Sequence, residues 1–398
     1  YNVVSSPTIF YMMDLYNEEE VTKPMSPSGQ FLEGTMLCLY IIGVLEFEVP
    51  IDDTNILSPF IDHILSINSQ FSSIVVADVN GVKKWKKVEV KLEEHIKAPN
   101  FPTGMSPKSY DEYLDEYLCR KSMEQSLQNN KPLWEIHMIN YPTSRAAGSL
   151  IFKLHHALGD GYSIMGGLLS CAQRVDNPSL PLSFPSRRPV SEQELAKGTK
   201  FRRLPSTLSL VMNTITDFGW SQLKSCVIAD DKTPIRSGDG GVEVRPISIT
   251  NILLSLDHLK EIKNNLGVTL NDVICGIVFL GIRLYMQEIN YKSRKACSTA
   301  LMALNTRTIE NYQSMKDMMK DNTKGALGNQ FTVLHVPIPG LGINAKSFNP
   351  LQFILHVHQI IKKKRHSLAF SLNGWILKML NKYRGHEAAA RHFYNTIS

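Results

Sequence analysis

The spacing of hydrophobic positions in the first half of the chain changes repeatedly between that of a helix and that of a strand. Apolar side chains recur at three- and four-residue steps, the spacing of an amphipathic helix, over residues 55–67 and 110–127. Short apolar runs bounded by polar or turn-forming residues predict strands at 36–49, 74–79, 133–139 and 148–154. The first half is therefore expected to be a mixed α/β domain.

The second half also alternates between helix and strand patterns, without an evident sequence repeat. Its patterns predict strands at 246–256, 297–304 and 331–338 and helices at 269–288 and 350–366. Between the halves, five prolines fall within residues 177–205, which is typical of a long crossover. We therefore predict an N-terminal extension (1–23), a first domain (24–176), a crossover (177–245) and a second domain (246–398) that ends without a closing element and lacks its last part.

Composition narrows the class of protein. At 398 residues, with 43% hydrophobic and 20% charged residues, the chain has the balance of a globular protein of two domains. A net charge of +6 suits a phosphate-bearing ligand or an anionic membrane, but is too small to indicate nucleic acid. The six cysteines form no C-x-x-C pair, so we expect reduced thiols rather than a zinc knuckle or disulfides. Uncharged apolar runs stay well below the roughly 18 residues of a membrane-spanning helix.

The sequence IFKLHHALGDG at 151–161 carries the candidate chemistry. Two adjacent histidines follow a predicted strand and precede an aspartate between two glycines. Because strand side chains alternate, His156 falls on the face of Leu154, whereas His155 shares the opposite face. A histidine held near a hydroxyl is well matched to take its proton at neutral pH, so His156 is a candidate general base. Asp160 is expected to cap the following helix and to fix the loop.

Three other interpretations of this segment remain open at this point. Adjacent histidines at a strand end can simply be packed and hydrogen-bonded, which is the commoner case for such a pair on its own. A metal site is less favoured, because neighbouring strand residues point apart and the glycines oppose a helical pairing of His156 with Asp160. A serine hydrolase is disfavoured too, since GYSIM at 161–165 lacks the closing glycine of G-x-S-x-G.

Residues 155–161 fit the HHxxxDG signature of the acyl-CoA-dependent acyltransferases related to chloramphenicol acetyltransferase. With its flanking residues 152–154, the segment most resembles that of the plant wax ester synthase/diacylglycerol acyltransferases. Further resemblances to that family occur in its order along the chain, at PMSP (24–27, with Met in place of Leu), PLW (132–134), ND (271–272) and GN (328–329). The resemblance covers nearly the whole chain, whereas HHxxxDG alone would indicate only the superfamily.

This resemblance implies a fold and a set of catalytic residues. The fold would be α/β (α+β), a two-domain chloramphenicol-acetyltransferase-like architecture with mixed sheets, flanking helices and an interdomain tunnel. The catalytic group would comprise His155, His156, Asp160 and Gly161, with His156 as general base and Asp160 organising the loop. The alcohol oxygen would attack acyl-CoA directly, without an acyl-enzyme. Acyl-CoA is then a co-substrate, and neither a metal site nor a bound cofactor is expected.

Two further motifs are candidate substrate contacts. The stretch 269–272 has the form of a capping box, so capping alone explains Asp272. Asn271 lies in the first helical turn, where its amide is a candidate to orient the thioester or to stabilise a developing oxyanion, with a cap as the alternative. The PLW motif is interpreted as core packing or as the wall of an acyl pocket, and consists of Pro132, Leu133 and Trp134.

An amphipathic stretch after the crossover indicates contact with a membrane surface. Basic residues precede an apolar helical face, namely Lys197, Lys200, Arg202 and Arg203 before Leu208, Val211, Met212, Ile215 and Phe218. This pattern is typical of an interfacial helix beside anionic headgroups, and packing against a domain is the alternative. Because the family resemblance implies endoplasmic reticulum membranes, we expect peripheral binding to their cytosolic face, or to the plasma membrane. The basic run at 362–365 is interpreted as a solvated helix end rather than a contact to CoA phosphates.

Three functions follow as hypotheses. The first is transfer of a long-chain acyl group from acyl-CoA to a long-chain fatty alcohol, giving a wax ester, with diacylglycerol as a second acceptor. The second is a soluble acyltransferase of the same superfamily that acts on a specialised alcohol, although DFGW at 217–220 only partly matches its DFGWG motif and lies in the wrong region. The third is a non-catalytic relative that only binds lipid.

Overall fold

The computed structural model describes residues 22–33, 39–51, 58–79, 81–124, 130–179, 203–239, 245–307, 328–341, 349–365 and 367–397. Within these ranges the strands form three sheets, ordered β1-β4-β3, β2-β7-β6-β5 and β8-β9. The strands are β1 (Thr22–Pro24), β2 (Tyr40–Phe47), β3 (Ser73–Ala77), β4 (Lys83–Lys87), β5 (Ile96–Lys97), β6 (Trp134–Ile139), β7 (Gly148–His155), β8 (Thr299–Asn305) and β9 (Phe331–Pro337). The pair β5-β6 is parallel and the others are antiparallel.

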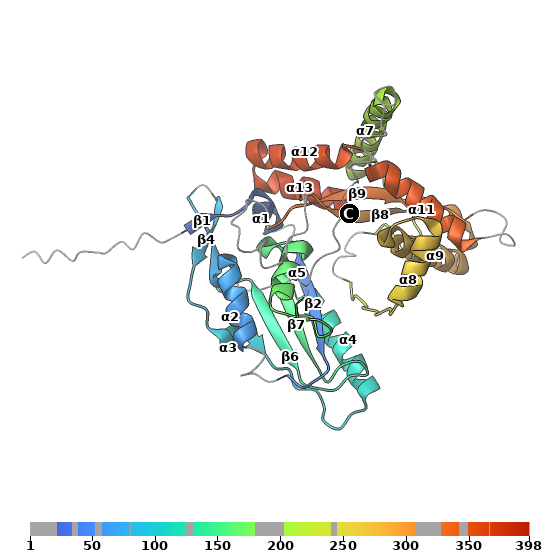
Figure 1. The fold of residues 1–398 in the computed structure, drawn as a ribbon. Helices are drawn as coiled ribbons and strands as arrows, with labels where there is room; N and C mark the ends of the chain where they lie inside the picture. Colours follow the sequence, from blue (N-terminus) through green and yellow to red (C-terminus); the bar gives the residue numbers. More distant parts are fainter. Residues whose placement is uncertain are drawn as a thin grey trace, which may run out of the picture.

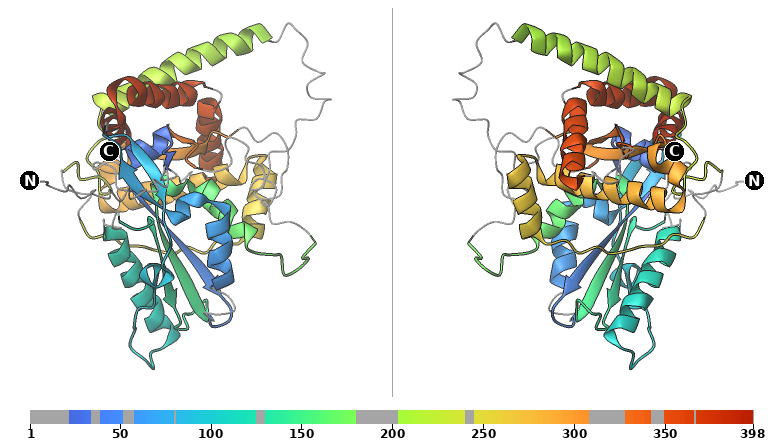
Figure 2. Two further views of the ribbon diagram at one scale, coloured as in Figure 1. Left: turned by 90° about the vertical axis from the view of Figure 1, so that its left-hand side faces the viewer. Right: turned by 90° about the vertical axis from the view of Figure 1, so that its right-hand side faces the viewer.

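Helices cover both faces of the larger sheet and of the β8-β9 pair (Figure 1). The longer helices are α1 (Pro27–Leu32), α2 (Ser58–Ile67), α4 (Pro107–Met123), α5 (Gly161–Ser170), α7 (Arg203–Cys226), α8 (Leu256–Leu266), α9 (Leu270–Ile289), α11 (Pro350–Arg365), α12 (Ala369–Arg384) and α13 (His386–Ile397). The short α3 (Leu92–His95) precedes β5. In Figure 2, α7 lies over α12 at one end of the molecule.

The strand β7 is buried along its whole length because helices cover both faces of its sheet. On one face, Phe152 and Leu154 pack with Ile61 of α2 and with the apolar side of α5. On the other face, Ile151 packs with Leu114 and its neighbours on α4. This explains why apolar residues lie on both faces of β7, and the strand leads directly to the two histidines.

The pair β8-β9 forms the centre of the second half. Alternate residues of β9 point to opposite faces, so Val336 packs against α9 and α11, whereas Val333 packs against α13. Phe31 and Leu32 of α1 belong to the same cluster as Val333, although they come from the beginning of the chain. The predicted first domain starts at residue 24, so its opening helix packs against the other half of the molecule.

Most of the elements expected from periodicity are present. The structure confirms the strands β2, β3, β6, β7, β8 and β9 and the helices α2, α4, α9 and α11, with ends that differ by several residues. The strand expected at 246–256 was wrong: residues 246–255 form no regular element, and Ile252 and Leu253 are 78% and 83% exposed. A strand needs a partner for its backbone groups, and this segment has none among the described residues. The domain boundaries stay predictions, and 180–202 and 240–244 of the crossover lie outside the described residues.

Candidate active site

The two histidines leave β7 through a single turn of 3-10 helix at His156–Leu158. The backbone N–H of His155 donates to the carbonyl of Leu133 at 3.0 Å, and that of His156 donates to the carbonyl of Leu39 at 2.9 Å. The loop is thus tied to the neighbouring strands on both sides. The two rings, which would alternate along a regular strand, are held in different environments.

His155 has a structural set of contacts. Its ring is 3% exposed, accepts a hydrogen bond at Nδ1 from the N–H of Ala157 at 3.1 Å, and meets the ring of Tyr40 edge-on at 5.2 Å. Burial, and then the charges of His156 and Lys83, lower the pKa of His155 to about 4. The residue is therefore neutral at physiological pH and holds the turn, and a catalytic part for it stays a prediction.

His156 is partly exposed and faces the second half of the chain. Its Nδ1 lies 2.9 Å from Oδ1 of Asn329, whose Nδ2 donates to the backbone carbonyl of His156 at 2.7 Å. The ring of Phe331 lies beside the imidazole, with centroids 5.3 Å apart. One ring nitrogen of His156 is therefore engaged by the protein, and within the described part of the chain no hydrogen bond to Nε2 is found.

Asp160 joins the two halves through a buried ion pair. Its carboxylate accepts from Nη1 and Nη2 of Arg307 at 2.7 and 3.0 Å, and both side chains are almost fully buried. It also accepts from the N–H groups of Ser163 and Gln330 at 3.0 and 2.8 Å. Burial alone would raise the pKa of Asp160, but the bonds from Arg307 and the two N–H groups together hold that pKa below its ordinary value.

The predicted cap is confirmed, and the cap is part of a larger network. Asp160 is the N-cap of α5, with its side chain on the N–H of Ser163. The Ser163 hydroxyl donates to the carbonyl of Gly328 at 2.7 Å, and Arg307 donates to the same carbonyl at 2.7 Å. Gly328 has φ +88°, a conformation that only glycine adopts without strain. The network therefore fixes the backbone on the residue just before Asn329.

The two glycines around Asp160 differ in their surroundings. A Cβ on Gly159 would lie 3.2 Å from the Cβ of Ser163, so a larger residue would press on the first turn of α5. Gly161 is exposed at the start of α5 and has open space around it. The structure gives no steric reason for a glycine at 161, and its place in the catalytic group stays a prediction.

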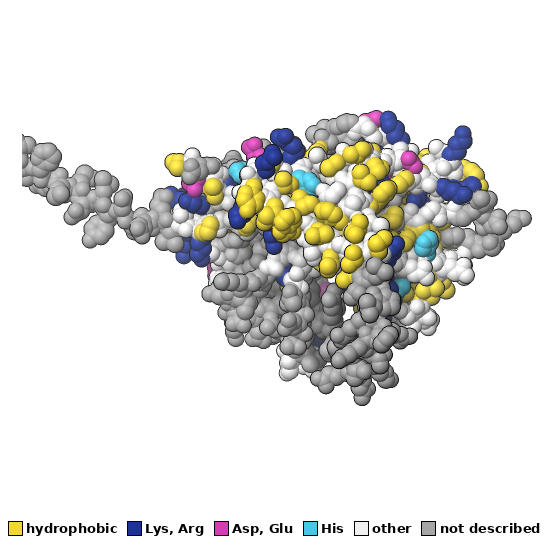
Figure 3. Space-filling view, turned by 90° about the horizontal axis from the view of Figure 1, so that it is seen from above, with side chains coloured by type: hydrophobic (Ala, Val, Ile, Leu, Met, Phe, Trp, Pro, Cys, Tyr) yellow, Lys and Arg dark blue, Asp and Glu magenta, His cyan; other side chains and the backbone are white. Residues whose placement is uncertain are grey.

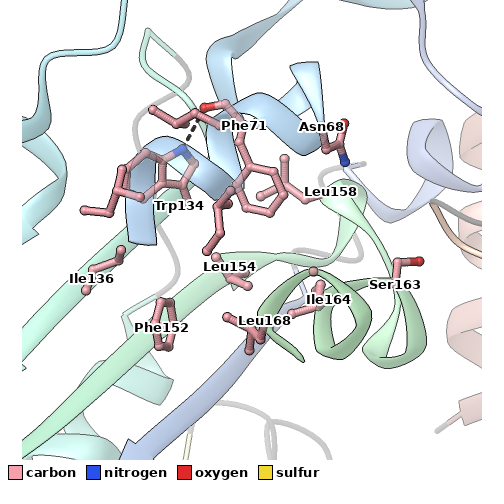
Figure 4. Close-up of a pocket in the computed structure, with 14 residues that line it drawn as sticks. Asn68, Phe71, Trp134, Ile136, Phe152, Leu154, Leu158, Ser163, Ile164 and Leu168 are labelled. Carbon is pink, nitrogen blue, oxygen red and sulfur yellow. Dashed lines mark hydrogen bonds between the residues drawn. The ribbon is translucent and has the colours of Figure 1, made fainter. Parts of the chain in front are cut away.

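An apolar pocket adjoins this loop (Figure 4). Its walls come from α2, β6, β7 and α5, and they include Leu154 and Leu158, which stand two positions before and two after His156. The space between the lining atoms is about 630 Å³ including the open mouth. The pocket is narrow, is lined almost entirely by apolar side chains, and lies within the first half of the chain. The tunnel expected between the domains stays a prediction.

The PLW motif contributes to the pocket and the sheet. Trp134 lines the pocket, and its indole N–H donates to the carbonyl of Phe71 at 2.8 Å, as the dashed line in Figure 4 shows. Pro132 and Leu133 are buried, and Leu133 supplies the carbonyl that binds the N–H of His155. The interpretation of this motif as core packing is confirmed, while its alternative as the wall of an acyl pocket and a direct contact with substrate stay predictions.

The ND motif has a capping residue and an exposed residue. Asp272 forms the predicted capping box with Thr269 and also accepts from Nδ1 of His358 at 2.8 Å. Asn271 is exposed in the first turn of α9, and the hydrogen bonds of the described residues do not connect it with His156. Its role in substrate binding stays a prediction.

Sequence reasoning missed the residues that complete the site. Arg307, Ser163 and the side-chain role of Asn329 were not singled out, although the GN motif pointed to the right position. A sequence signal for Arg307 was lacking, because it is 147 residues away from Asp160. Among the described residues, we find no cluster of three or more His, Cys, Asp or Glu side chains that could hold a metal ion.

Comparison with solved structures identifies the fold. The first condensation domain of the calcium-dependent antibiotic synthetase superposes with a TM-score of 0.50 at 11% identity, over 81% of this chain and 69% of that one. A wax ester synthase/diacylglycerol acyltransferase from Marinobacter aquaeolei VT8 aligns with a TM-score of 0.48 at 14% identity, over 94% and 79% of the two chains. The first of these superpositions shows the fold alone: the chain has a mixed α/β, chloramphenicol-acetyltransferase-like fold, which it shares with that condensation domain.

Sequence comparison then identifies the family. The wax ester synthase/diacylglycerol acyltransferase catalytic domain matches residues 78–274, and the C-terminal domain of the same family matches residues 327–398. The Arabidopsis thaliana wax ester synthase/diacylglycerol acyltransferase 7 is 28% identical over 95% of this chain and 81% of its own length. Number 11 of that series is 29% identical over 94% and 77%. The chain belongs to the wax ester synthase/diacylglycerol acyltransferase family and is thus an acyltransferase.

Proposed function

We propose that the protein transfers a long-chain acyl group from acyl-CoA to a long-chain fatty alcohol, and in a second activity to diacylglycerol. The observation that carries this proposal is the position of His156. Its Nδ1 is engaged by Asn329, while Leu154 and Leu158 on either side of it line a narrow apolar pocket. His156 itself does not line this pocket, but a base whose neighbours in the chain do so suits an alcohol with a long hydrocarbon chain.

In the proposed reaction, His156 acts as general base and then as general acid. Nε2 takes the proton of the alcohol hydroxyl while the oxygen bonds to the thioester carbonyl carbon. When the carbon–sulfur bond breaks, the same proton passes to the sulfur, giving the ester and free CoA. Asp160 holds the loop, and Asn271 is proposed to contact the thioester. Apolar walls favour this transfer over hydrolysis because they keep water away from the thioester.

The apolar pocket is proposed to hold one hydrocarbon chain. Its lining side chains include Phe152, Leu154 and Leu168, and its polar contribution comes from Asn68 and Ser163 at one end (Figure 4). An alkyl chain gains about 0.8 kcal/mol for each methylene removed from water. A narrow pocket with such walls therefore favours long unbranched chains over compact aromatic alcohols.

A product assay tests the proposed function. The purified chain is incubated with radiolabelled palmitoyl-CoA and either hexadecanol, a diacylglycerol or a phenolic alcohol, and the lipids are separated. We expect wax ester as the main product and triacylglycerol as a minor one. Acylation of the phenolic alcohol alone would favour a specialised acyltransferase. If no acceptor is acylated while palmitoyl-CoA still binds, the chain is a lipid-binding relative and the proposal is wrong.

We further propose that the enzyme binds the cytosolic face of the endoplasmic reticulum membrane through α7 and α12. Helix α7 turns its polar side toward the protein and its apolar side outward, the opposite of an ordinary surface helix. Its polar residues Asp217 and Ser221 are buried, whereas Val211, Met212 and Ile215 are 52%, 54% and 61% exposed. The buried residues find partners inside the chain, Lys364 for Asp217 at 2.7 Å and His335 for Ser221 at 3.1 Å.

The neighbouring helix extends this surface. Leu368, Leu372 and Trp375, at the start of α12, are 49%, 37% and 57% exposed. Figure 3 shows apolar side chains across the middle of this face and Lys and Arg at its margins. Such an arrangement suits an anionic lipid surface. Phe218, which the sequence placed on the same apolar face, is partly buried. The other side chains of the predicted interfacial segment lie outside the described residues, namely those of Lys197, Lys200, Arg202, Arg203 and Leu208.

No individual helix among those the structure describes is long and apolar enough to cross a bilayer. The helices α8 and α9 meet the criterion of length and composition only as a pair, and they are bent by 102° where they meet.

Vesicle sedimentation tests the membrane proposal. Replacing both Ile215 and Trp375 by Asp should weaken binding to vesicles of phosphatidylcholine and phosphatidylserine at least about tenfold. Burying one such apolar side chain contributes about 1.5–3 kcal/mol, and tenfold in affinity corresponds to about 1.4 kcal/mol. As a control, Val79→Asp changes a fully exposed apolar residue in the turn between β3 and β4 and should leave binding unchanged. Equal binding by the double variant and the parent chain would contradict the proposal.

A further inference from the structure

The contact between His156 and Asn329 determines which ring nitrogen carries the hydrogen. In an asparagine side chain the oxygen and the nitrogen have similar shapes, so their positions must be assigned from their partners. One partner here is the backbone carbonyl of His156, which can only accept a hydrogen bond. The atom 2.7 Å from that carbonyl must therefore be Nδ2, and Oδ1 must be the atom that faces Nδ1 at 2.9 Å.

The amide oxygen can only accept, so the ring nitrogen that faces it must donate. A neutral imidazole carries one hydrogen, and a contact to Oδ1 places that hydrogen on Nδ1. Nε2 then keeps its lone pair. We propose that Asn329 is the positioning residue that sets the tautomer of His156 and leaves Nε2 free to take the proton of the acyl acceptor. This inference rests on the proposed role of His156 as general base.

The surroundings of Asn329 hold its amide in one orientation. The carbonyl before it, on Gly328, accepts from Ser163 and Arg307 at 2.7 Å each, and the N–H after it, on Gln330, donates to Asp160 at 2.8 Å. The backbone carbonyl of Asn329 itself accepts from the hydroxyl of Ser28 at 3.3 Å. The buried ion pair at Asp160 thus acts on His156 through Asn329, without touching the imidazole.

The ring of His156 is restrained on a second side. The Phe331 ring lies 5.3 Å away at an angle of 42°, which limits rotation of the imidazole. Rotation that exchanged Nδ1 for another atom would break the bond to Asn329 and leave its partly buried oxygen without that donor, which disfavours the rotation. The Nδ1–H tautomer is therefore favoured by the contact itself, in contrast to His155, whose Nδ1 accepts from Ala157.

Nitrogen NMR of the full chain tests this inference directly. The protein is labelled with 15N-histidine, and the signals of His156 are identified by their loss in His156→Gln. At a pH where the ring is neutral, we expect the pattern of an Nδ1–H, Nε2-lone-pair imidazole in the parent chain. In Asn329→Leu, which keeps the size but has no acceptor, the Nε2–H form should become populated. Asn329→Asp keeps an acceptor and should retain the hydrogen on Nδ1.

Kinetics supply a second readout. In Asn329→Leu we expect kcat to fall by about 10²-fold, the lower end of what a general base contributes, with KM for palmitoyl-CoA unchanged. A matched control is Asn140→Leu, because Asn140 also bonds with its Oδ1 and Nδ2 to a single residue, the backbone of Ile51. It stands beyond the other end of β6 from Trp134, so it should change neither the tautomer nor kcat.

The outcomes separate this inference from the proposed function. If the parent chain carries the hydrogen on Nε2, or if Asn329→Leu retains it on Nδ1, the inference is wrong even when ester is formed. If the tautomers behave as expected but the parent chain acylates no acceptor, only the proposed function is wrong. Should Asn329→Leu fail to fold, the parent chain and Asn329→Asp still decide the question, because both must show hydrogen on Nδ1.

Discussion

Replacing His156 by Ala should lower the rate of ester formation by roughly 10²–10⁴-fold, the contribution of a positioned general base. The loss should appear in kcat, with little change in KM for palmitoyl-CoA, because the proposed partner of Nε2 is the alcohol hydroxyl and not the bulk of the thioester. Initial rates with hexadecanol over a range of palmitoyl-CoA concentrations measure both quantities. Circular dichroism of the variant establishes that its secondary structure is unchanged.

Two further substitutions sharpen this experiment. His156→Gln keeps a polar side chain of similar length but cannot accept the proton at neutral pH, so it should be as inactive as His156→Ala. His258→Ala removes an exposed histidine on α8 and should leave the rate unchanged. If His156→Ala makes ester as fast as the parent chain, His156 is not the base and the proposed mechanism fails.

Replacing Asp160 by Asn should lower the free energy of unfolding by about 3–5 kcal/mol. This is the usual cost of removing one partner from a buried ion pair, because the other charge stays buried without its counterpart. The side chains of Arg307 and Asp160 are only 5% and 8% exposed, so water cannot take the place of the carboxylate. The new amide N–H₂ would also face donors from Arg307 or Gln330. The shift of the urea unfolding midpoint measures this effect.

A double-variant cycle and an exposed pair provide the controls. Asp160→Asn combined with Arg307→Met should cost less than the sum of the two single changes, because the second removes the charge that the first leaves unpaired. Asp257→Asn breaks an exposed ion pair with Lys260, and such pairs contribute at most about 1 kcal/mol. If Asp160→Asn is no more destabilising than Asp257→Asn, the ion pair does not hold the two halves together.

Activity should follow the same network. Asp160, Arg307 and Ser163 act on the backbone on both sides of Asn329, so loosening them should also release the ring of His156. Asp160→Asn is therefore expected to lose ester formation under conditions where it is still folded. The three-residue spacing of Asp160 and Ser163 explains the cap on α5, whereas the other hydrogen bonds of the Asp160 carboxylate join the two halves of the chain.

Helix α7 illustrates a limit of sequence patterns. Its stripe of Val211, Met212 and Ile215 was recognisable from periodicity alone, but a stripe does not say whether it faces the protein or the outside. The answer depends on Asp217, which pairs with Lys364 at a distance of 147 residues along the chain. Because the polar side finds partners inside the protein, the apolar side is left exposed.

Short-range sequence patterns predicted the structure correctly where the interacting residues are close together in the chain. Three features involve neighbours within a few residues, so their spacing predicts them. They are the apolar residues of β7, the cap of Asp160 on the N–H of Ser163, and the capping box of Thr269 with Asp272. The same reasoning failed at 246–256, where an apolar pattern did not find a strand to pair with. Alternation shows which residues can form a strand, and only a partner makes them form one.

The amino-acid sequence by itself determined the alternation of helices and strands, the family motifs and the histidine pair at the end of a buried strand, because each depends on residue type and short-range spacing. The tertiary structure decided how the two histidines differ, which nitrogen of His156 is engaged and what balances the charge of Asp160. Those properties depend on Asn329 and Arg307, 173 and 147 residues further along the chain. Hydrogen bonds and ion pairs act over a few ångströms, so such partners can be identified only once folding has brought them together.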